Sequence, residues 1–431
     1  MALAARERPS RARAGLARAA DAGVRVLVVN AGSSSVKLSL LEPARGADSE
    51  RDERDVVLAA CELDAPRAHI EPRRLRQALR SRLGEADAVG HRIVHGGERY
   101  RAPVRIDAEV RSALGELTEL APLHQPKSLA ALDAVSEALP RLPAVACFDT
   151  AFHATLAPGA ATYALPARWR KRWPLRRYGF HGLSHAWIAR RTPQLLAGPS
   201  ARPAAAHAPS PPAAADAPAR DAGAAAGPRI VSCHLGAGAS LCAIAGGRSL
   251  DTTMGFTPLE GLVMATRSGS VDPGLLLWLA EDGRVSVREL ADALEHRSGL
   301  LALAGSADMR EVLERAERDD ERARLALEVY VHRLRGAIAT MAAALDGLDA
   351  LVFTGGVGER SARVRALAAQ GLGFLGVELD HARNRDAAPD AELSAAGARV
   401  RTLVIGARED IEIARQTRTL LAAVQADQTQ P

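Results

Sequence analysis

The segment of residues 26–41, VLVVNAGSSSVKLSLL, constrains the fold more than any other part of the chain. Two apolar runs of the β type flank a turn that holds Asn30, Gly32 and three serines, and Lys37 lies in the second run. Glycine lets the backbone bend sharply, and successive N–H groups in such a turn can converge on an anion. A plain β-hairpin explains the pattern almost as well as a phosphate-binding hairpin. It is not a P-loop, because no Gly-Lys-Ser/Thr opens a helix after the turn.

Two further glycine turns follow along the chain. Residues 230–244, IVSCHLGAGASLCAI, repeat the strand–turn–strand pattern, with His234 in the place of Asn30. Residues 351–361, LVFTGGVGERS, predict a buried strand, a Gly-Gly turn and then a helix. Three such turns, two of them alike, predict a duplicated nucleotide-binding α/β fold. The hairpins resemble the phosphate loops of the sugar kinase, Hsp70 and actin superfamily.

Five other blocks lie between these turns: HRIVHGGE at 91–98, APLHQP at 121–126, FDTAFHATLAP at 148–158, RYGFHGLSH at 177–185 and MATRSGSVDPG at 264–274. Together with the glycine turns, this ordered set resembles the acetate and propionate kinase family. The resemblance spans about residues 24–417. It implies an α/β, two-domain, duplicated actin-like ATPase (ribonuclease H-like) fold with an interdomain cleft that holds the active site.

The resemblance and the local composition together predict the domain organisation. Residues 1–23 are expected to form a disordered N-terminal extension, although their basic, acid-poor composition would also suit an organelle transit peptide. The first actin-like domain is expected over 24–158, completed by a C-terminal helix of about 410–424. The second, nucleotide-binding domain is expected over 178–409. It carries an Ala/Pro-rich, low-complexity insertion at about 199–228, which cannot bury a core.

Composition narrows the class of protein. A chain of 431 residues fits two domains, and 47% hydrophobic residues with no apolar run of membrane length predict a soluble protein without a membrane partner. The four cysteines form no CxxC motif, which predicts buried thiols in a reducing cytoplasm. The net charge of +5 comes almost entirely from arginine, and aromatics make up only 3%, so no nucleic-acid partner is predicted. An arginine-based nucleic-acid-binding protein is the alternative outside nucleotide chemistry, and it would show strongly salt-dependent DNA affinity.

The activity that the resemblance implies is reversible phosphoryl transfer between ATP and acetate, giving acetyl phosphate and ADP by direct in-line attack. Such a reaction brings two anions together, and the arginine fork suits both carboxylate and phosphate. A lone arginine here would ordinarily be a surface residue, and a lone histidine or aspartate a structural one. The family motifs instead assign the catalytic residues Arg92, Asp149, His181 and Arg267.

The resemblance also assigns the binding residues. The acyl group would lie against Val94, Leu123, Phe180 and Pro258, with Arg92 on the carboxylate. The phosphates of ATP or ADP would be bound by Ser33, Ser35, Lys37, His124, His234, Leu235, Gly236, Ala237 and Gly238. The adenosine would lie against Asp308, Met309, Arg310, Gly355, Gly356, Val357 and Gly358. Mg2+, with Mn2+ as an alternative, would be associated with Asn30 and Glu409.

The chain departs from the family pattern at three positions. Ala237 stands where relatives carry the asparagine of HLGNG, Gln125 replaces an asparagine, and Arg360 replaces another. Ala237 removes an amide near the phosphates and motivates one alternative, a non-catalytic nucleotide sensor of the same fold. A propionate or other short-chain acyl kinase is the second alternative. We still expect a working enzyme, which the resemblance implies is a homodimer. The reason is that the chain keeps the main polar residues of the family motifs, namely Asn30, Arg92, Asp149, His181, Arg267 and Glu409.

Overall fold

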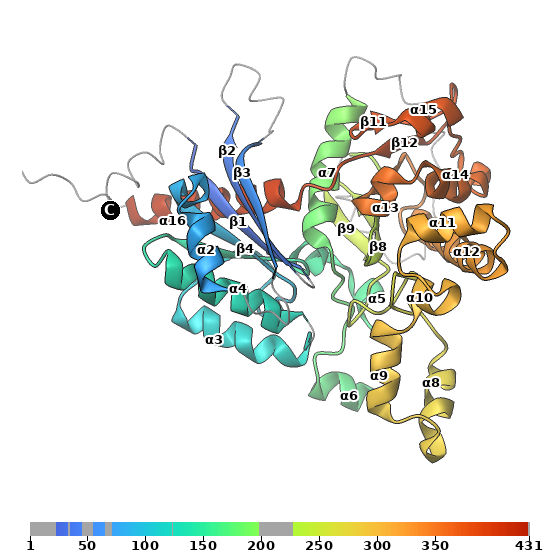
Figure 1. The fold of residues 1–431 in the computed structure, drawn as a ribbon, viewed down its shortest axis with the longest axis horizontal. Coiled ribbons are helices and arrows are strands. Elements are labelled where there is room, and N and C mark those ends of the chain that lie inside the picture. The colour runs from blue at the N-terminus through green and yellow to red at the C-terminus, as the bar shows by residue number, and fades with distance from the viewer. Residues whose placement is uncertain are drawn as a thin grey trace, which may run out of the picture. The chain divides into compact units, whose positions relative to one another are not determined.

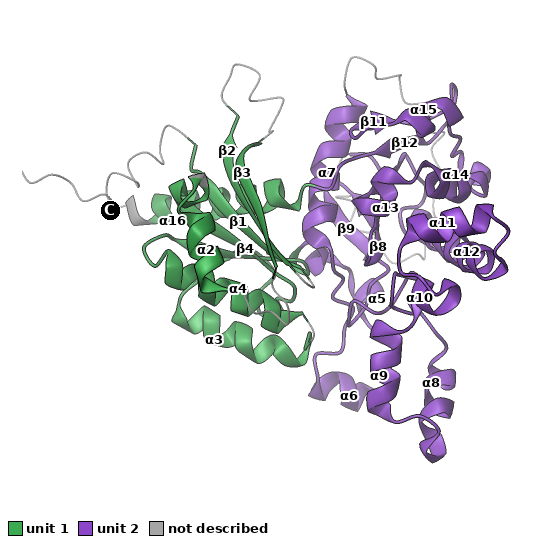
Figure 2. Cartoon of the chain, viewed as in Figure 1, with its two compact units in different colours: residues 1–151, 408–431 green, residues 152–407 purple. Residues whose placement is uncertain are grey.

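The computed structural model describes residues 23–32, 35–44, 55–64, 71–122, 124–197 and 227–429 (Figure 1). The chain divides into two compact units (Figure 2). Unit 1 combines residues 1–151 with residues 408–431, whereas unit 2 is the continuous stretch 152–407. Each unit is built on a six-stranded mixed sheet with helices packed on it.

Unit 1 contains the strands β1 (Val26–Ala31), β2 (Ser35–Pro43), β3 (Asp55–Asp64), β4 (Ala88–Ile93), β5 (Val104–Arg105) and β6 (Ala144–Phe148). Its helices are α2 (Pro72–Leu79), η2 (Arg82–Glu85), α3 (Ala108–Glu116), η3 (Leu117–Glu119), α4 (Gln125–Ala138) and α16 (Glu409–Thr429). The strand order is β3-β2-β1-β4-β6-β5. The β1–β2 hairpin is antiparallel as the sequence predicted, and β1, β4 and β6 run parallel. Their carboxyl ends therefore meet at one edge of the sheet.

Helices cover both faces of the unit 1 sheet. On one face, α2 and α4 pack against alternate strand residues, among them Leu27, Val29 and Val89. On the other face, α16 lies across β1, β4 and β6, and it is longer than the helix expected at about 410–424. Arg418 of α16 holds the Asp55 carboxylate at 2.8 Å and donates to the backbone carbonyls of Val24, just before β1, and Leu41 on β2. The last helix of the chain is thus an integral layer of unit 1.

The contact between α16 and β4 depends on Gly90. A Cβ built on Gly90 would lie 2.6 Å from both Ile413 Cγ2 and Thr417 Oγ1. We expect Gly90→Ala to lower the free energy of unfolding of unit 1 by about 1–3 kcal/mol, because the helix must shift to admit the methyl group. Gly115→Ala is the matched control, since its Cβ would meet only Arg111 Nη1 at 3.6 Å.

Urea unfolding followed by circular dichroism measures the effect. The prediction fails if the two alanine variants unfold at the same urea concentration.

Unit 2 contains β7 (Ile230–Leu235), β8 (Ala239–Ala245), β9 (Arg248–Thr252), β10 (Ala350–Thr354), β11 (Ala391–Glu392) and β12 (Arg401–Val404). Its helices are η4 (Ala151–Thr155, which starts at the last residue of unit 1), α5 (Pro158–Ala161), α6 (Ala167–Arg172), α7 (Gly182–Leu196), α8 (Pro273–Ala280), η5 (Glu281–Gly283), α9 (Val287–His296), α10 (Gly299–Ala304), α11 (Met309–Glu317), α12 (Glu321–Ala344), α13 (Gly355–Arg360), α14 (Ala362–Gln370), η6 (Gly373–Leu375) and α15 (His381–Asp386).

The two sheets share one topology. The unit 2 order is β11-β12-β10-β7-β8-β9, which matches the unit 1 order when it is read from the other end. The pairing directions match as well, because β7–β8, β8–β9 and β11–β12 are antiparallel while β7–β10 and β10–β12 are parallel. The duplicated actin-like ATPase type of fold that the two similar hairpins predicted is therefore present.

The thiols differ slightly from the expectation. Cys147, Cys233 and Cys242 are buried, but Cys61 on β3 is only partly buried. Burial raises the pKa of the Cys147 thiol to about 12. Among the described residues, no helix combines the length and the hydropathy that crossing a bilayer would require.

Candidate active site

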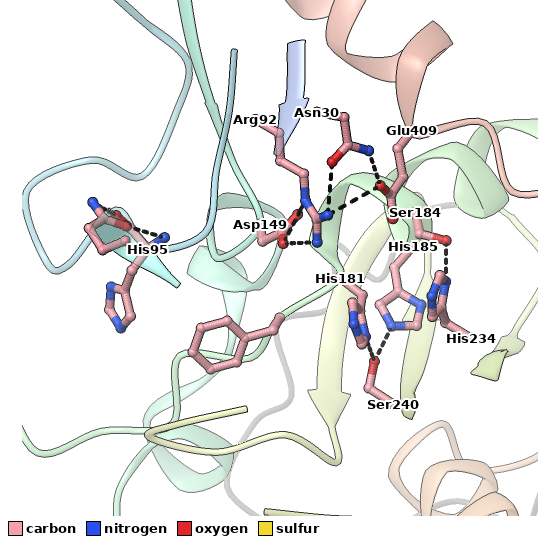
Figure 3. Close-up of polar contacts among 12 residues, drawn as sticks. Asn30, Arg92, His95, Asp149, His181, Ser184, His185, His234, Ser240 and Glu409 are labelled. Carbon is pink, nitrogen blue, oxygen red and sulfur yellow. Dashed lines mark hydrogen bonds and ion pairs between the residues drawn. The ribbon is translucent and has the colours of Figure 1, made fainter. Parts of the chain in front are cut away.

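Four polar side chains gather at the carboxyl edge of the unit 1 sheet (Figure 3). Asn30 lies on β1, Arg92 on β4, Asp149 directly after β6, and Glu409 at the start of α16. Side chains alternate between the two faces of a strand, so the preceding or following residue of each points the other way. The neighbours that pack in the cores of the α4 face are Val29, Ile93 and Phe148. Alternation therefore places Asn30, Arg92 and Asp149 on the α16 face.

Arg92 is the centre of this cluster. Its Nη2 lies 2.6 Å from Asp149 Oδ2, and its Nε donates to both carboxylate oxygens at 3.0 and 3.2 Å. Its Nη1 donates to Asn30 Oδ1 at 3.0 Å and lies 3.7 Å from Glu409 Oε2. Asn30 Nδ2 in turn donates to Glu409 Oε2 at 3.0 Å. The guanidinium is held in a fixed orientation by three different elements.

Burial and charge act in opposite directions within this cluster. Burial raises the pKa of the Asp149 carboxyl, while the Arg92 guanidinium opposes that rise. Burial also disfavours the charged form of Arg92, but the Asp149 and Glu409 carboxylates outweigh it and raise the pKa of Arg92. Arg92 therefore remains a cation although it is largely withdrawn from water.

The oxygen atoms of this cluster suit a hard cation. Mg2+ prefers oxygen ligands and keeps several waters, so it needs only one or two protein carboxylates. Asn30 and Glu409 are neighbours here and offer an amide oxygen and a carboxylate. In the described part of the chain, no group of three or more His, Cys, Asp or Glu side chains could hold a metal by itself. The residues present therefore fit a metal that is bound mainly through water and substrate.

A second cluster lies in unit 2, around the turn between β7 and β8. His181 precedes α7 with a φ of 55°, in the left-handed region that few residues other than glycine adopt. Its ring stacks on His234 of β7, with 4.4 Å between the ring centroids. A Cβ built on Gly238 would lie 3.3 Å from His181 Nε2, and one built on Gly236 would lie 3.9 Å from His234 Nε2. Both Nε2 atoms thus lie on the side of the glycine turn.

Arg267 brings a third nitrogen atom, a guanidinium donor, to the same turn. A Cβ built on Gly238 would lie 3.5 Å from Arg267 Nη1. The same Nη1 donates to the Pro258 carbonyl at 3.2 Å. Its Nε pairs with Glu295 Oε2 of α9 at 3.1 Å. Burial lowers the pKa of Arg267 and Glu295 opposes this, but a guanidinium stays protonated at neutral pH. The turn is therefore flanked by donors that can meet an anion.

The glycine turn after β10 approaches β7 closely. Gly355 has a φ of +77°, and a Cβ there would lie 2.8 Å from the Leu235 carbonyl oxygen, so only glycine fits. The Gly355 N–H donates to Glu359 Oε1 at 3.0 Å. Arg365, which is almost fully buried, donates to the Gly358 and Glu359 carbonyls at 2.9 and 2.7 Å. These contacts fix α13, which also carries the partly buried Gly356 and Val357.

The predicted adenosine-side residues open α11. Asp308 accepts from the Arg310 N–H at 2.9 Å and pairs with Arg310 Nη2 at 2.6 Å, while Met309 is buried. The hydrogen bonds from Arg310 lower the pKa of the Asp308 carboxyl.

The first hairpin carries the other predicted phosphate ligands. Ser35 lies on β2, where its hydroxyl donates to Glu62. Lys37 is exposed and stands opposite Asn30 in the β1–β2 register. Ser33 lies outside the described residues, and so does Leu123 of the predicted acyl pocket.

The remaining predicted residues belong to different units. Val94 is buried and His124 partly buried in unit 1, next to α4. Phe180 and Pro258 are buried in unit 2. No single unit therefore contains all the residues assigned to the acyl pocket.

Two of the departures from the family pattern have structural partners. Gln125 is buried, and its side chain accepts from the His95 N–H at 3.3 Å and donates to the His95 and Leu114 carbonyls. Arg360 Nε donates to the Gly356 carbonyl at 3.2 Å. The third, Ala237, is exposed at the tip of the β7–β8 turn, where the Ala265 N–H donates to its carbonyl.

The sequence analysis assigned no role to several residues that form hydrogen bonds or ion pairs with the predicted site residues. Ser240 stands opposite His234 in the β7–β8 register, so its place in the hairpin could have revealed it. Glu359 lies within the glycine motif itself. Glu295 offered no local signal, because it reaches Arg267 from a separate amphipathic helix.

The sequence profile of the acetokinase family matches residues 72–205 and 223–415, which is most of the chain. The chain belongs to the acetokinase family. An acetate kinase from Deinococcus deserti is 43% identical over 427 residues, covering 93% of this chain and 99% of the relative.

Solved structures of the family are similar as well. The crystal structure of acetate kinase from Porphyromonas gingivalis matches with a TM-score of 0.76 and 33% identity, covering 92% of this chain and 100% of that one. A propionate kinase from Francisella tularensis matches with a TM-score of 0.75 and 31% identity, covering 92% and 99%.

Proposed function

We propose that this protein is an acetate kinase that transfers a phosphoryl group reversibly between ATP and acetate, giving acetyl phosphate and ADP. Family membership and the similarity to acetate kinases over nearly the whole chain support the reaction. The observation that carries the proposal is the Arg92 cluster, in which an arginine is oriented by Asp149 beside an amide and a carboxylate suited to a metal.

Arg92 binds the acetate carboxylate, because a planar guanidinium can meet both of its oxygens. Asp149 orients Arg92 and need not accept a proton, since acetate is already ionised at neutral pH. Arg267 and His181 donate to the phosphoryl group in transfer, where charge builds up on its oxygens. The family motifs assign the methyl group to the apolar residues Val94 and Leu123 of unit 1 and Phe180 and Pro258 of unit 2.

The nucleotide is bound by the residues that the sequence analysis assigned to it. In unit 2, the β7–β8 turn, including His234, Leu235 and Gly236 to Gly238, binds phosphate. In unit 1, the family motifs assign phosphate contacts to Ser33, Ser35, Lys37 and His124. Asp308 to Arg310 and the Gly355 to Gly358 turn bind the adenosine side. Asn30 and Glu409 would hold Mg2+ or Mn2+, mainly through water. When bound, such a metal would neutralise part of the negative charge on the phosphates of ATP.

A hydroxamate-trapping assay with ATP, Mg2+ and the C1 to C4 carboxylic acids tests this function. We expect acetate to give the highest kcat/KM and propionate the next highest. A higher value for propionate would make the chain a propionate kinase, a second candidate supported by the similar propionate kinase structure. ATP binding by calorimetry without turnover of any acid would instead show a nucleotide sensor.

Ala237 provides a more specific test. We expect Ala237→Asn to raise kcat/KM for ATP about three- to thirtyfold, because the added amide can donate to a phosphate oxygen and such bonds contribute roughly 1.5–3 kcal/mol net, part of which a water at this exposed position already supplies. The position is exposed, so the larger side chain need not disturb the core. Steady-state kinetics decide the matter. An unchanged or lower kcat/KM would show that this turn binds phosphate through its backbone alone.

We also propose that the protein is a cytoplasmic homodimer. The sequence PGLLLWLA forms α8, none of whose residues is buried. Leu275, Leu277 and Trp278 have exposed fractions of 46%, 67% and 54%. An apolar helix without a core to cover suits a contact with a second subunit. Light scattering of the wild type and of a Leu277→Glu/Trp278→Glu variant tests this, and a dimer in both would place the interface elsewhere.

A further inference from the structure

A chain of hydrogen bonds runs from His181 to Ser232 in unit 2, and Figure 3 shows its part from His181 through Ser240 to His185. His181 Nδ1 lies 3.0 Å from Ser240 Oγ, and Ser240 Oγ lies 2.9 Å from His185 Nε2. His185 Nδ1 then lies 2.9 Å from Ser232 Oγ. Ser232, Ser240 and His185 are fully buried. Two strands and α7 thus hold four side chains in one continuous line.

Strand alternation explains why this line exists. Ser232 and His234 lie two residues apart on β7 and therefore share a face, and Ser240 stands opposite His234 on β8. The helix on this face is α7, which contributes Ser184 and His185. His181, which caps α7, reaches the outer end of the line.

Two directions of the chain let the buried Ser240 hydroxyl both donate and accept a hydrogen bond. Burial holds the pKa of His185 well below its ordinary value, so the ring is neutral and carries one N–H. A serine hydroxyl has one proton to donate. Among the described residues, Ser240 Oγ contacts only these two imidazoles. Its buried proton therefore finds an acceptor only when Ser240 donates to one ring and accepts from the other. The choice at Ser240 fixes every other donor in the line.

The two directions give His181 different properties. If Ser240 donates to His181 Nδ1, a neutral His181 carries its proton on Nε2, and His185 donates to Ser240 while Ser232 donates to His185. If Ser240 donates to His185 instead, His181 Nδ1 must donate to Ser240. His181 Nε2 is then a lone-pair acceptor unless the ring takes up a second proton.

The surroundings of His181 Nε2 favour the first direction. This atom faces the Gly238 turn, where Arg267 Nη1 also lies, so an anion there would repel a lone pair. The neighbouring histidine repeats the arrangement, because Ser184 Oγ lies 2.8 Å from His234 Nδ1 while His234 Nε2 faces Gly236. In both rings a serine hydroxyl meets Nδ1 and the other nitrogen faces the turn.

We propose that Ser240, held by His185 and Ser232, fixes His181 as a neutral Nε2–H tautomer that donates to the phosphoryl group. Ser240 and His185 are positioning residues, and His181 is the group that touches the substrate. The role of His181 toward the phosphoryl group rests on the proposed phosphoryl transfer. The direction of the hydrogen bonds does not, and it can be measured without turnover. It makes His181 a donor that does not depend on protonation of its ring.

The first measurement uses the complete protein with 15N-labelled histidine. Two-bond 1H–15N correlation spectra distinguish protonated from unprotonated ring nitrogens, and His181→Gln identifies the signals of His181. At pH 7.5 we expect a protonated Nε2 and an unprotonated Nδ1. A proton on Nδ1 with an unprotonated Nε2 would overturn the proposal, whether or not any variant folds.

The second measurement uses Ser240→Ala. We expect the signals of His181 to shift toward the average of the two tautomers and kcat to fall about tenfold, less than the loss of a whole oxyanion donor. The KM for acetate should change little, and Ser240→Thr, which keeps the hydroxyl, should restore the tautomer and most of kcat. A pure Nε2–H tautomer or a wild-type kcat in Ser240→Ala would overturn the proposal.

Ser184→Ala is the matched control, because it removes a serine hydroxyl from His234 instead. It should shift the signals of His234 and leave those of His181 in place. A shift of His181 in this control as large as in Ser240→Ala would contradict a specific role for Ser240. If the wild type makes no acyl phosphate, the proposed function fails, while the spectra still decide the direction of the chain.

Discussion

Arg92→Ala is expected to lower kcat for acetyl phosphate formation by about a hundredfold or more. The reason is the loss of the positive charge that would bind the acceptor carboxylate, and losses of preorganised donors have effects of this size. We do not expect a water molecule to take over the role of Arg92 in this variant, because Asp149, Asn30 and Glu409 hold its guanidinium in one orientation.

Activity alone would not prove this role, since Arg92→Ala also leaves Asp149 without its partner. The Asp149 side chain is 1% exposed, and breaking a buried ion pair from one side costs about 3–5 kcal/mol. We therefore expect Arg92→Ala to be less stable than the wild type. The double variant Arg92→Ala/Asp149→Asn should recover much of the stability, because no buried carboxylate is left unpaired.

The double variant separates folding from catalysis. Its thermal unfolding should approach that of the wild type, while its kcat should stay at the level of Arg92→Ala or below. Recovery of activity together with stability would mean that Arg92 acts only as a structural ion-pair partner.

The second large effect concerns acid stability. His91, His95, His153 and His185 are buried. Burial lowers the pKa of His91, His95 and His153 to about 4 from an ordinary value of 6.5, and that of His185 lies well below 6.5. Between pH 6.5 and 4 the unfolded chain binds protons that the folded protein does not. Stability must therefore fall as the pH falls through this window, by at most about 3 kcal/mol for each histidine.

His91 is the most informative of the four. It lies on the α4 face of β4, and neither of its ring nitrogens has a hydrogen-bond partner among the described residues. His91→Leu should be at least as stable as the wild type at pH 8, since it removes buried polar atoms without partners. At pH 5 it should be more stable by about 2 kcal/mol, because it removes one of the titrating groups.

Urea unfolding at several pH values measures this difference. The four tryptophans (Trp169, Trp173, Trp187 and Trp278) all lie in unit 2, so fluorescence follows unit 2 whereas circular dichroism follows both units. The effect of His91→Leu should appear in the circular dichroism transition and leave the fluorescence transition in place. His381→Gln, which removes an exposed histidine, is the control. Equal pH dependence in wild type and His91→Leu would contradict the prediction.

The sequence predicted those parts of the fold that depend on neighbouring residues. The apolar runs and glycine turns predicted the β1–β2 and β7–β8 hairpins and the strand before Gly355. The sequence did not predict that the two sheets match strand for strand out to their edges. The equivalent edge strands β5 and β11 have only two residues each, too few for a periodic pattern.

The predicted site residues were found through motifs, but their partners depend on tertiary packing. Nothing in the sequence near Arg267 points to Glu295, because α9 brings that carboxylate from elsewhere in unit 2. The line from His181 to Ser232 likewise requires that α7 lie on one particular face of β7 and β8. Motifs identified the residues proposed to bind the substrate, and packing supplied the groups that orient them.

The split of unit 1 over the two ends of the chain has a consequence for biosynthesis. The ribosome finishes β1 to β6 early, yet α16, which covers one face of their sheet, emerges only after all of unit 2. At roughly 5–20 residues per second, this delay is on the order of tens of seconds. During that time the α16 face of the nascent sheet is open to chaperones or to aggregation. Asn30 and Glu409, 379 residues apart, therefore meet only after all of unit 2 has been made, so a chain truncated before Glu409 cannot assemble the Arg92 cluster.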